Sequence, residues 1–220
     1  MKQILIILAS CGLSGNGEPP DGKWLEELTV PYRRFREAGY AVFISAPCAN
    51  AQGGARILEA MKKNAPDGLD PGLEHLFLLE EVTHWHFDAL YYPGKYVPEC
   101  ACVGGAGHIE LLSRMFDAGK VIGAVSHGPA SLLGCVRCDG QPLVFRHSVT
   151  GLSKAEEAEL VGDPAAGFRL EDRLREAGAL YISKGPWETC VVADGNLITG
   201  QNPNSAGNVA ETMIRQLEHE

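Results

Sequence analysis

The sequence contains no run of lysines or arginines, and its formal net charge is −9 with a pI near 5.3. It therefore lacks the basic patch that nucleic acids or anionic membranes attract. No apolar stretch is long enough to span a bilayer, and no internal repeat or low-complexity linker is visible. We expect neither a nucleic-acid nor a membrane partner, and a small neutral or electrophilic molecule as the substrate.

A dense cysteine framework is also missing. The seven cysteines are an odd number spread along the chain, which indicates a reduced, cytoplasmic compartment. Cys135 and Cys138 have a spacing typical of zinc ligands, but no second pair clearly completes a site. Residues 8–11 resemble a lipoprotein cleavage box, yet the apolar run before them is shorter than a secretory segment, so a buried first strand explains them better. We predict no metal and no cofactor.

What the sequence has is an alternation of continuous apolar runs with amphipathic segments. This pattern is expected when helices cover both faces of a mostly parallel sheet. The length of 220 residues and the 45% apolar content suit one α/β domain over residues 1–220. The predicted strands are 3–10, 41–45, 89–92, 121–125, 180–183, 190–193 and 197–199, the last two as an antiparallel hairpin.

Helices are predicted between these strands. Pro31 lies inside the first of them, so we expect a kink or break there. Glycine- and proline-rich stretches at 12–23, 46–55 and 64–72 are predicted loops, and 93–107 a long loop over the carboxyl edge of the sheet. The predicted helices are 24–38, 109–118, 129–135, 154–160, 170–177 and 205–217.

The segment 120–130 carries the most informative feature, an apolar strand that turns sharply into a helix at Ser126. Such an elbow exposes one side chain to a ring of backbone N–H groups, which stabilise negative charge. The pattern is close to the G-x-S-x-G elbow of α/β-hydrolases. Those enzymes place their histidine late in the chain, where only His147 and His219 are available, so we disfavour that class.

Several further segments together resemble the ThiJ/PfpI superfamily, which has a class I glutamine amidotransferase-like fold, and within it the heat-shock chaperone and glyoxalase III branch. The resemblance implies an α/β/α sandwich of flavodoxin-like type with a nucleophile elbow, and it covers nearly the whole chain. The matching residues are 21–28, 31–32, 35–40, 87–90, 93–94, 124–129, 149–153, 156–157, 185–187 and 199–203.

In that family the elbow residue is normally cysteine, so Ser126 departs from the pattern. The resemblance implies that Glu27 is the carboxylate beside it, unless Glu27 faces solvent as Glu26 does. It also implies that His127 pairs with a downstream carboxylate, Glu157, unless the histidine is only structural. Glu156 is adjacent to Glu157, and in a helix only one of the two is expected to point inward.

The resemblance further implies an oxyanion site from the backbone N–H groups of Gly94 and His127. Beyond Gly94 the chain departs from the branch, which usually continues with glycine and histidine and here continues with Lys95. The segment 95–107 therefore predicts a different pocket wall. His108 either lines that pocket or is a surface histidine at a helix end, and Trp187 is a packing residue that also approaches the substrate.

Ser126 is either native or replaces a cysteine. With cysteine, the resemblance implies a cofactor-free conversion of a 2-oxoaldehyde into a 2-hydroxy acid, a reaction in which we expect the serine chain to be inactive. The alternatives are a native serine hydrolase or hydratase of an amide, imine, isonitrile or activated carbonyl, and a stress-response holdase chaperone. Relatives of this branch are commonly homodimers, so we expect a homodimer.

Overall fold

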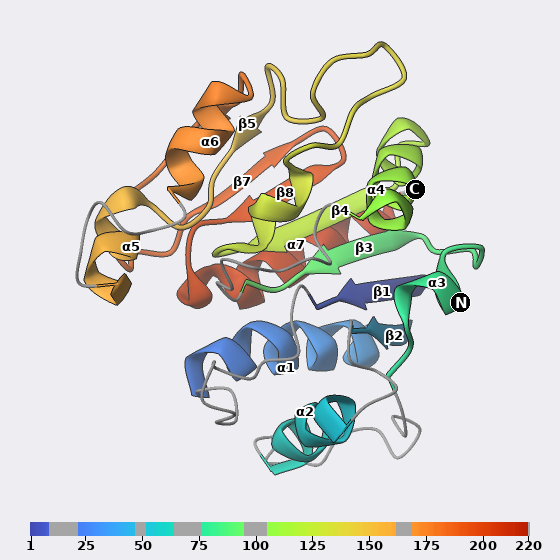
Figure 1. Ribbon diagram of the computed structural model, residues 1–220. Helices are drawn as coiled ribbons and strands as arrows, with labels where there is room; N and C mark the ends of the chain where they lie inside the picture. The colour runs from blue at the N-terminus through green and yellow to red at the C-terminus, as the bar shows by residue number, and fades with distance from the viewer. Residues whose placement is uncertain (9–21, 47–51, 64–75, 95–104, 162–168, 220) are drawn as a thin grey trace.

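The computed structural model describes residues 1–8, 22–46, 52–63, 76–94, 105–161 and 169–219. Its centre is a six-stranded sheet in the order β2-β1-β3-β4-β8-β7, in which only the β7–β8 pair is antiparallel (Figure 1). The strands are β1 (Gln3–Ile7), β2 (Ala41–Ser45), β3 (Ala89–Tyr92), β4 (Val121–Val125), β7 (Val191–Asp194) and β8 (Leu197–Gly200). This is the predicted α/β fold.

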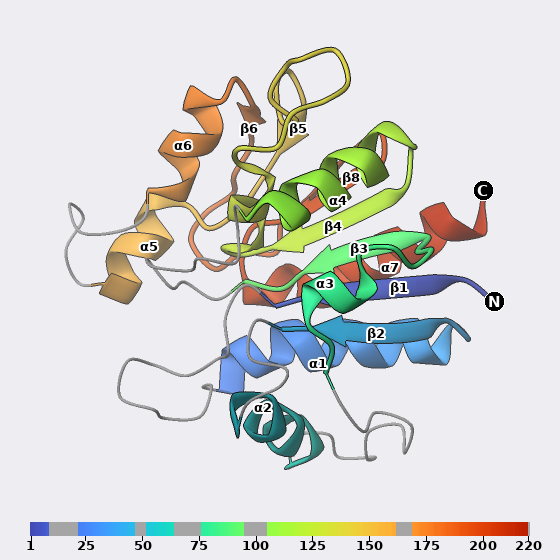
Figure 2. The ribbon, with the colours of Figure 1, turned by 45° about the vertical axis from the view of Figure 1, so that its right-hand side comes forward.

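Helices cover both faces of this sheet, as Figures 1 and 2 show. One face packs against α1 (Gly22–Glu37), α2 (Gln52–Lys63) and α7 (Ala206–Glu218). The other packs against α3 (Leu79–Val82), α4 (Ala106–Asp117) and α6 (Leu170–Glu176). The helix α5 (Lys154–Val161) lies beyond the carboxyl ends of the strands, at the left of Figure 1. Among the described residues no helix is long and apolar enough to cross a membrane.

The strand β1 shows why an unbroken apolar run predicts this architecture. Ile4 and Ile6 belong to the core on one face, whereas Leu5 and Ile7 belong to the core on the other. All four are buried. Because successive side chains of a strand point to opposite faces, a sheet covered on both sides needs apolar residues at every position.

The predicted strands 41–45, 89–92 and 121–125 are confirmed at their bounds, and the antiparallel hairpin is confirmed with ends one residue away. The first strand ends at Ile7, and residues 9–10 of its predicted range lie outside the described residues. The predicted strand 180–183 is shortened to β6 (Leu180–Tyr181). It pairs with a strand that was not predicted, β5 (Ser148–Val149), in a separate two-stranded parallel sheet.

The predicted break of the first helix is wrong, because α1 runs through Pro31, whereas a kink there stays a prediction. A proline has no N–H to give to the carbonyl four residues earlier, which here belongs to Glu27. The phenol of Tyr91 donates to that carbonyl oxygen at 2.8 Å. A hydrogen bond from the sheet thus replaces the one that the helix lacks.

Other helix predictions need smaller corrections. The segment predicted as helix 129–135 is a 3₁₀ helix, η1 (Gly128–Leu132), and the helix 109–118 begins earlier, at Ala106. Residues 52–55, predicted as loop, open α2, and α3 was not predicted. The helices predicted at 154–160, 170–177 and 205–217 are α5, α6 and α7 with ends shifted by one residue. The predicted loop 64–72 and most of 93–107 lie outside the described residues.

Candidate active site

Ser126 follows β4 directly and has a φ of 59°, in the left-handed region that side chains rarely adopt. Its backbone is held on both sides, because its N–H donates to the Gly200 carbonyl at 2.9 Å and its carbonyl accepts from the Leu152 N–H at 2.8 Å. The residue is 5% exposed. This is the strained strand-to-helix turn that the sequence predicted, with the hydroxyl side chain at its apex.

Gly94 packs against this elbow because β3 and β4 are neighbours in the sheet. A Cβ atom at position 94 would lie 2.4 Å from the His127 nitrogen, 2.6 Å from the Val125 oxygen and 2.7 Å from the Ser126 Cβ. Only glycine fits such a close approach of two backbones. The predicted oxyanion residues Gly94 and His127 are therefore adjacent in space at the nucleophile position.

The predicted pairing of His127 with Glu157 is present in the geometry. The His127 Nε2 lies 3.7 Å from the Glu157 Oε1, and both side chains are buried. The same carboxylate accepts from the backbone N–H groups of Arg169, at 2.9 Å, and Leu170, at 3.3 Å. Burial raises the pKa of the Glu157 carboxyl, but the nearby His127 and the hydrogen bonds from these two N–H groups outweigh it and hold the pKa below its ordinary value.

Glu156 also points inward, which corrects the expectation that only one of the two adjacent glutamates does so. It is fully buried, and its Oε2 accepts from the N–H and hydroxyl of Ser153 at 2.8 and 2.7 Å. Its Oε1 faces residues 187, 201 and 202. The two side chains leave α5 in different directions, and both directions are covered because other segments pack around this helix.

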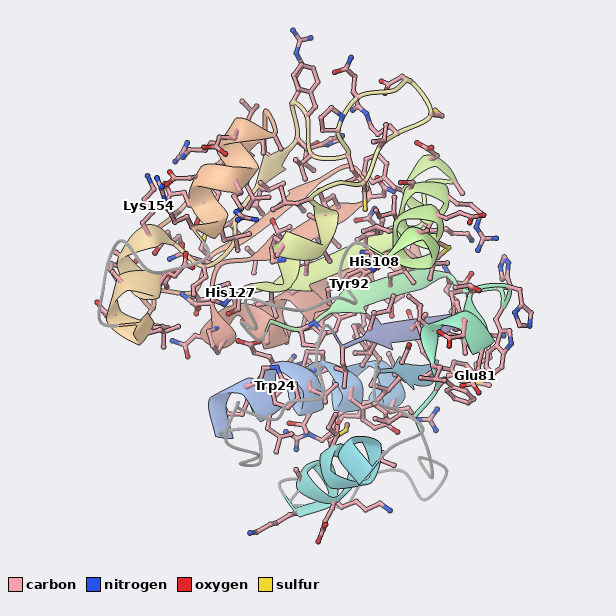
Figure 3. The ribbon with its side chains drawn as sticks, in the orientation of Figure 1. Trp24, Glu81, Tyr92, His108, His127 and Lys154 are labelled. Atoms are coloured by element: carbon pink, nitrogen blue, oxygen red, sulfur yellow. The ribbon has the colours of Figure 1, made fainter. Side chains whose placement is uncertain are left out.

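Glu27 is 2% exposed, whereas Glu26 is exposed, so the solvent-facing alternative for Glu27 is wrong. Its turn of α1 is attached to β3 by the hydrogen bond from Tyr91. Trp24, one turn earlier, lies at the same end of the sheet as His127 (Figure 3). The first helix thus brings a buried carboxylate to the carboxyl end of the strands, where the elbow lies.

His108 is 2% exposed, so its interpretation as a surface histidine is wrong. Its Nε2 lies 3.1 Å from the Ser131 carbonyl, and its ring meets the Tyr92 ring edge-on at 5.5 Å between centroids (Figure 3). Burial lowers the pKa of the imidazole, which favours the neutral form with a proton on Nε2. The Ser131 hydroxyl donates to the Gly128 carbonyl at 2.7 Å, so His108 supports the segment that follows the elbow.

Trp187 lies on the loop between β6 and β7 with a φ of 63°. Its backbone N–H donates to the Glu156 Oε1 at 2.8 Å, and its indole N–H donates to the Glu159 Oε2 at 2.5 Å. Two carboxylates of α5 therefore fix this half-buried ring. Contact between Trp187 and a substrate stays a prediction.

The thiols with zinc-like spacing differ in their surroundings. Cys135 is buried, and burial raises its pKa to about 11, whereas Cys138 is exposed. Over the described part of the chain, no group of three or more histidine, cysteine or acidic side chains has an arrangement that would hold a metal ion.

An elbow of this kind, set on a mostly parallel sheet beside a buried histidine–carboxylate pair, defines the class of α/β proteins that present a nucleophile at a strand end. The chain belongs to the DJ-1/PfpI family, whose sequence profile matches residues 21–216. The glutathione-independent glyoxalase HSP31 of Saccharomyces cerevisiae is 34% identical over 116 residues, which cover 50% of this chain and 49% of that protein. The glutathione-independent glyoxalase hsp3101 of Schizosaccharomyces pombe is 24% identical over 213 residues, which cover 88% of this chain and 86% of that protein.

Solved structures show the same fold over the full length. The Rapid Encystment Protein of Francisella tularensis aligns with a TM-score of 0.78 and 26% identity, covering 99% of both chains. The glyoxalase III of Candida albicans aligns with the same TM-score of 0.78 and 20% identity, covering 100% of this chain and 98% of that one. The family thus includes proteins named as enzymes, and this chain shares their architecture.

Proposed function

We propose that the protein is a cofactor-independent enzyme of the glyoxalase III type, built to act on a small electrophilic carbonyl compound such as a 2-oxoaldehyde. The observation that carries the proposal is the meeting of Ser126, the Gly94 backbone and the buried His127–Glu157 pair at one strand end. The names of the yeast relatives support the same chemistry, although the aligned part spans about half the length of HSP31.

The proposed reaction has three steps. The nucleophile adds to the aldehyde carbon, and the oxygen that becomes negative is stabilised by the N–H groups of Gly94 and His127. A proton then moves from that carbon to the neighbouring carbonyl carbon through an enediol, with Glu27 and His127 as the proton carriers. Water finally cleaves the acyl–enzyme bond, the 2-hydroxy acid leaves, and the nucleophile regains its proton.

The residue at position 126 sets the rate of the first step. A thiol at an elbow of this type loses its proton readily and attacks as a preformed anion. A serine hydroxyl stays protonated until a base removes its proton during the attack. A loss of about ten-thousandfold would correspond to about 5.5 kcal/mol of additional barrier. We therefore expect negligible glyoxalase activity from the chain with Ser126.

The test is the Ser126→Cys variant, assayed for the formation of 2-hydroxy acids from a panel of 2-oxoaldehydes. We expect measurable turnover from this variant and none from the Ser126 protein or from Ser126→Ala. Circular dichroism and thermal unfolding serve as folding controls. A folded Ser126→Cys protein that is inert toward the whole panel contradicts the proposal.

A native serine enzyme is the second candidate, and the His127–Glu157 pair favours it. A serine nucleophile needs a neighbouring base that a carboxylate orients, and His127 beside Glu157 is the histidine–carboxylate pair that we propose for this role. Such an enzyme would hydrolyse or hydrate an amide, imine, isonitrile or activated carbonyl. Incubation with an electrophilic probe and mass mapping is expected to place the label on Ser126. A label that never appears there argues against covalent serine catalysis.

A further inference from the structure

The backbone of Ser126 is held by two segments that come from different parts of the chain. One segment supplies the Leu152 N–H and the other supplies the Gly200 carbonyl. A residue other than glycine keeps a left-handed conformation only where its surroundings fix it. The direction of the Ser126 side chain therefore depends on how firmly these two segments are held relative to each other.

The carboxylate of Glu156 connects the residues that follow these two holding positions. Its Oε2 accepts from the N–H and hydroxyl of Ser153, at 2.8 and 2.7 Å. Its Oε1 accepts from the Gln201 Nε2 at 3.1 Å and from the Asn202 Nδ2 at 2.8 Å. One buried side chain thus joins the two segments directly beside the elbow.

These contacts match a carboxylate better than an amide. The Oε1 also accepts from the Trp187 N–H at 2.8 Å, so that five donors converge on the two oxygens of a fully buried side chain. A glutamine amide would turn its NH₂ group toward some of those donors. The network thus distinguishes glutamate from glutamine at position 156.

We propose that Glu156 is a positioning residue that keeps the elbow in the conformation in which position 126 reacts. It acts through the two segments that hold the backbone of Ser126, while Glu157, the next residue, pairs with His127. The inference rests on the proposed function only in taking position 126 as the reacting residue.

The test uses a readout that is independent of the substrate. In the Ser126→Cys protein, the rate of alkylation of Cys at position 126 by iodoacetamide is followed against pH, with peptide mass mapping to separate it from the natural cysteines. The midpoint of this profile reports how well the backbone N–H groups stabilise the thiolate. Loss of the elbow geometry raises the midpoint. Removal of a negative charge alone lowers it, so the sign separates positioning from simple electrostatics.

The main variant is Glu156→Gln in the Ser126→Cys background. We expect the midpoint to rise by about one pH unit, which lowers the alkylation rate about tenfold at pH values below both midpoints. Ser153→Ala and Asn202→Ala each remove one donor without changing the charge, and we expect smaller shifts in the same direction. Glu176→Gln, at the exposed end of α6, is the charge-matched control and is expected to leave the midpoint unchanged.

The proposal is overturned if folded Glu156→Gln protein has an unchanged or lowered midpoint. If Glu156→Gln does not fold, unchanged midpoints in folded Ser153→Ala and Asn202→Ala overturn it instead. Failure of the proposed function is a separate result, since a Ser126→Cys protein without activity on 2-oxoaldehydes still gives an alkylation profile.

Discussion

Replacement of Gly94 by alanine is the most direct perturbation of the site, because the added atom meets two backbone atoms and one Cβ atom of the elbow. Its Cβ would lie 2.4 Å from the His127 nitrogen, 2.6 Å from the Val125 oxygen and 2.7 Å from the Ser126 Cβ. Ordinary contacts between such atoms are about 3.5 Å, so the end of β3 and the elbow must separate by about 1 Å. Overpacking of this kind costs about 1–3 kcal/mol of stability.

The same displacement moves the Gly94 N–H away from the oxygen that it is proposed to bind. A misplacement of about 1 Å in a catalytic site can lower the rate about 100-fold. We therefore expect Gly94→Ala, in the Ser126→Cys background, to lose about 1–3 kcal/mol of unfolding free energy in urea and about two orders of magnitude in kcat/KM.

Gly107→Ala is the matched control, because Gly107 lies in the first turn of α4 and, among the described residues outside its own turn, no heavy atom lies within 4 Å of an added Cβ. It is expected to leave both quantities unchanged or to stabilise the protein slightly. Equal stability and activity for Gly94→Ala and Gly107→Ala would refute the close approach of the two backbones and the oxyanion role derived from it.

Two further predictions concern buried titratable groups and are measured by urea unfolding across pH. Glu157→Gln leaves the N–H group of either Arg169 or Leu170 facing the NH₂ group of the new side chain, which cannot accept a hydrogen bond. It is expected to lower the free energy of unfolding by about 1–3 kcal/mol near pH 7. Because the folded-state pKa of Glu157 is depressed, the difference in unfolding free energy between the unsubstituted protein and Glu157→Gln is complete above the ordinary value of 4.5 and shrinks as the pH falls below it. A difference that stays constant with pH contradicts the assignment. The folded-state pKa of His108 lies below its ordinary value of 6.5. Its contribution to the free energy of unfolding is therefore complete above the ordinary value of 6.5 and is lost as the pH falls. His108→Gln is expected to flatten the decline in stability between about pH 7 and pH 5. An unchanged decline would contradict this.

The central strands could be predicted to the residue because they are buried on both faces. In β3 and β4 every residue is covered, so the apolar run has the same length as the strand. The two-residue strand β5 has no such pattern, because a strand that short has no period to detect. Pro31 misled the prediction because its effect depends on Tyr91, about 60 residues later, which only the fold brings to the orphaned carbonyl.

The family resemblance located the elbow, Glu27 and the His127–Glu157 pair; the structure buries their side chains and brings His127 next to Glu157, while their catalytic roles stay predictions. Glu156 was missed because periodicity describes one helix alone, whereas the residues that cover Glu156 come from segments elsewhere in the chain. A signal was nevertheless present: Ser153 and Glu156 have the S-x-x-E spacing of a capping box, which the structure contains with both hydrogen bonds formed.

The surroundings of Ser126 explain why the choice between oxygen and sulfur matters so much in this fold. Glu27, Glu156 and Glu157 are all at least 97% buried, so the region already contains three carboxyl side chains and little solvent. A permanent anion at position 126 is therefore tolerable only as far as the backbone N–H groups stabilise it, which a thiolate requires continuously. In the proposed serine mechanism that stabilisation is required only during the reaction, when a neighbouring base accepts the proton. Under the proposed function, the atom at position 126 thus determines whether the reaction begins from a preformed anion or from a protonated nucleophile.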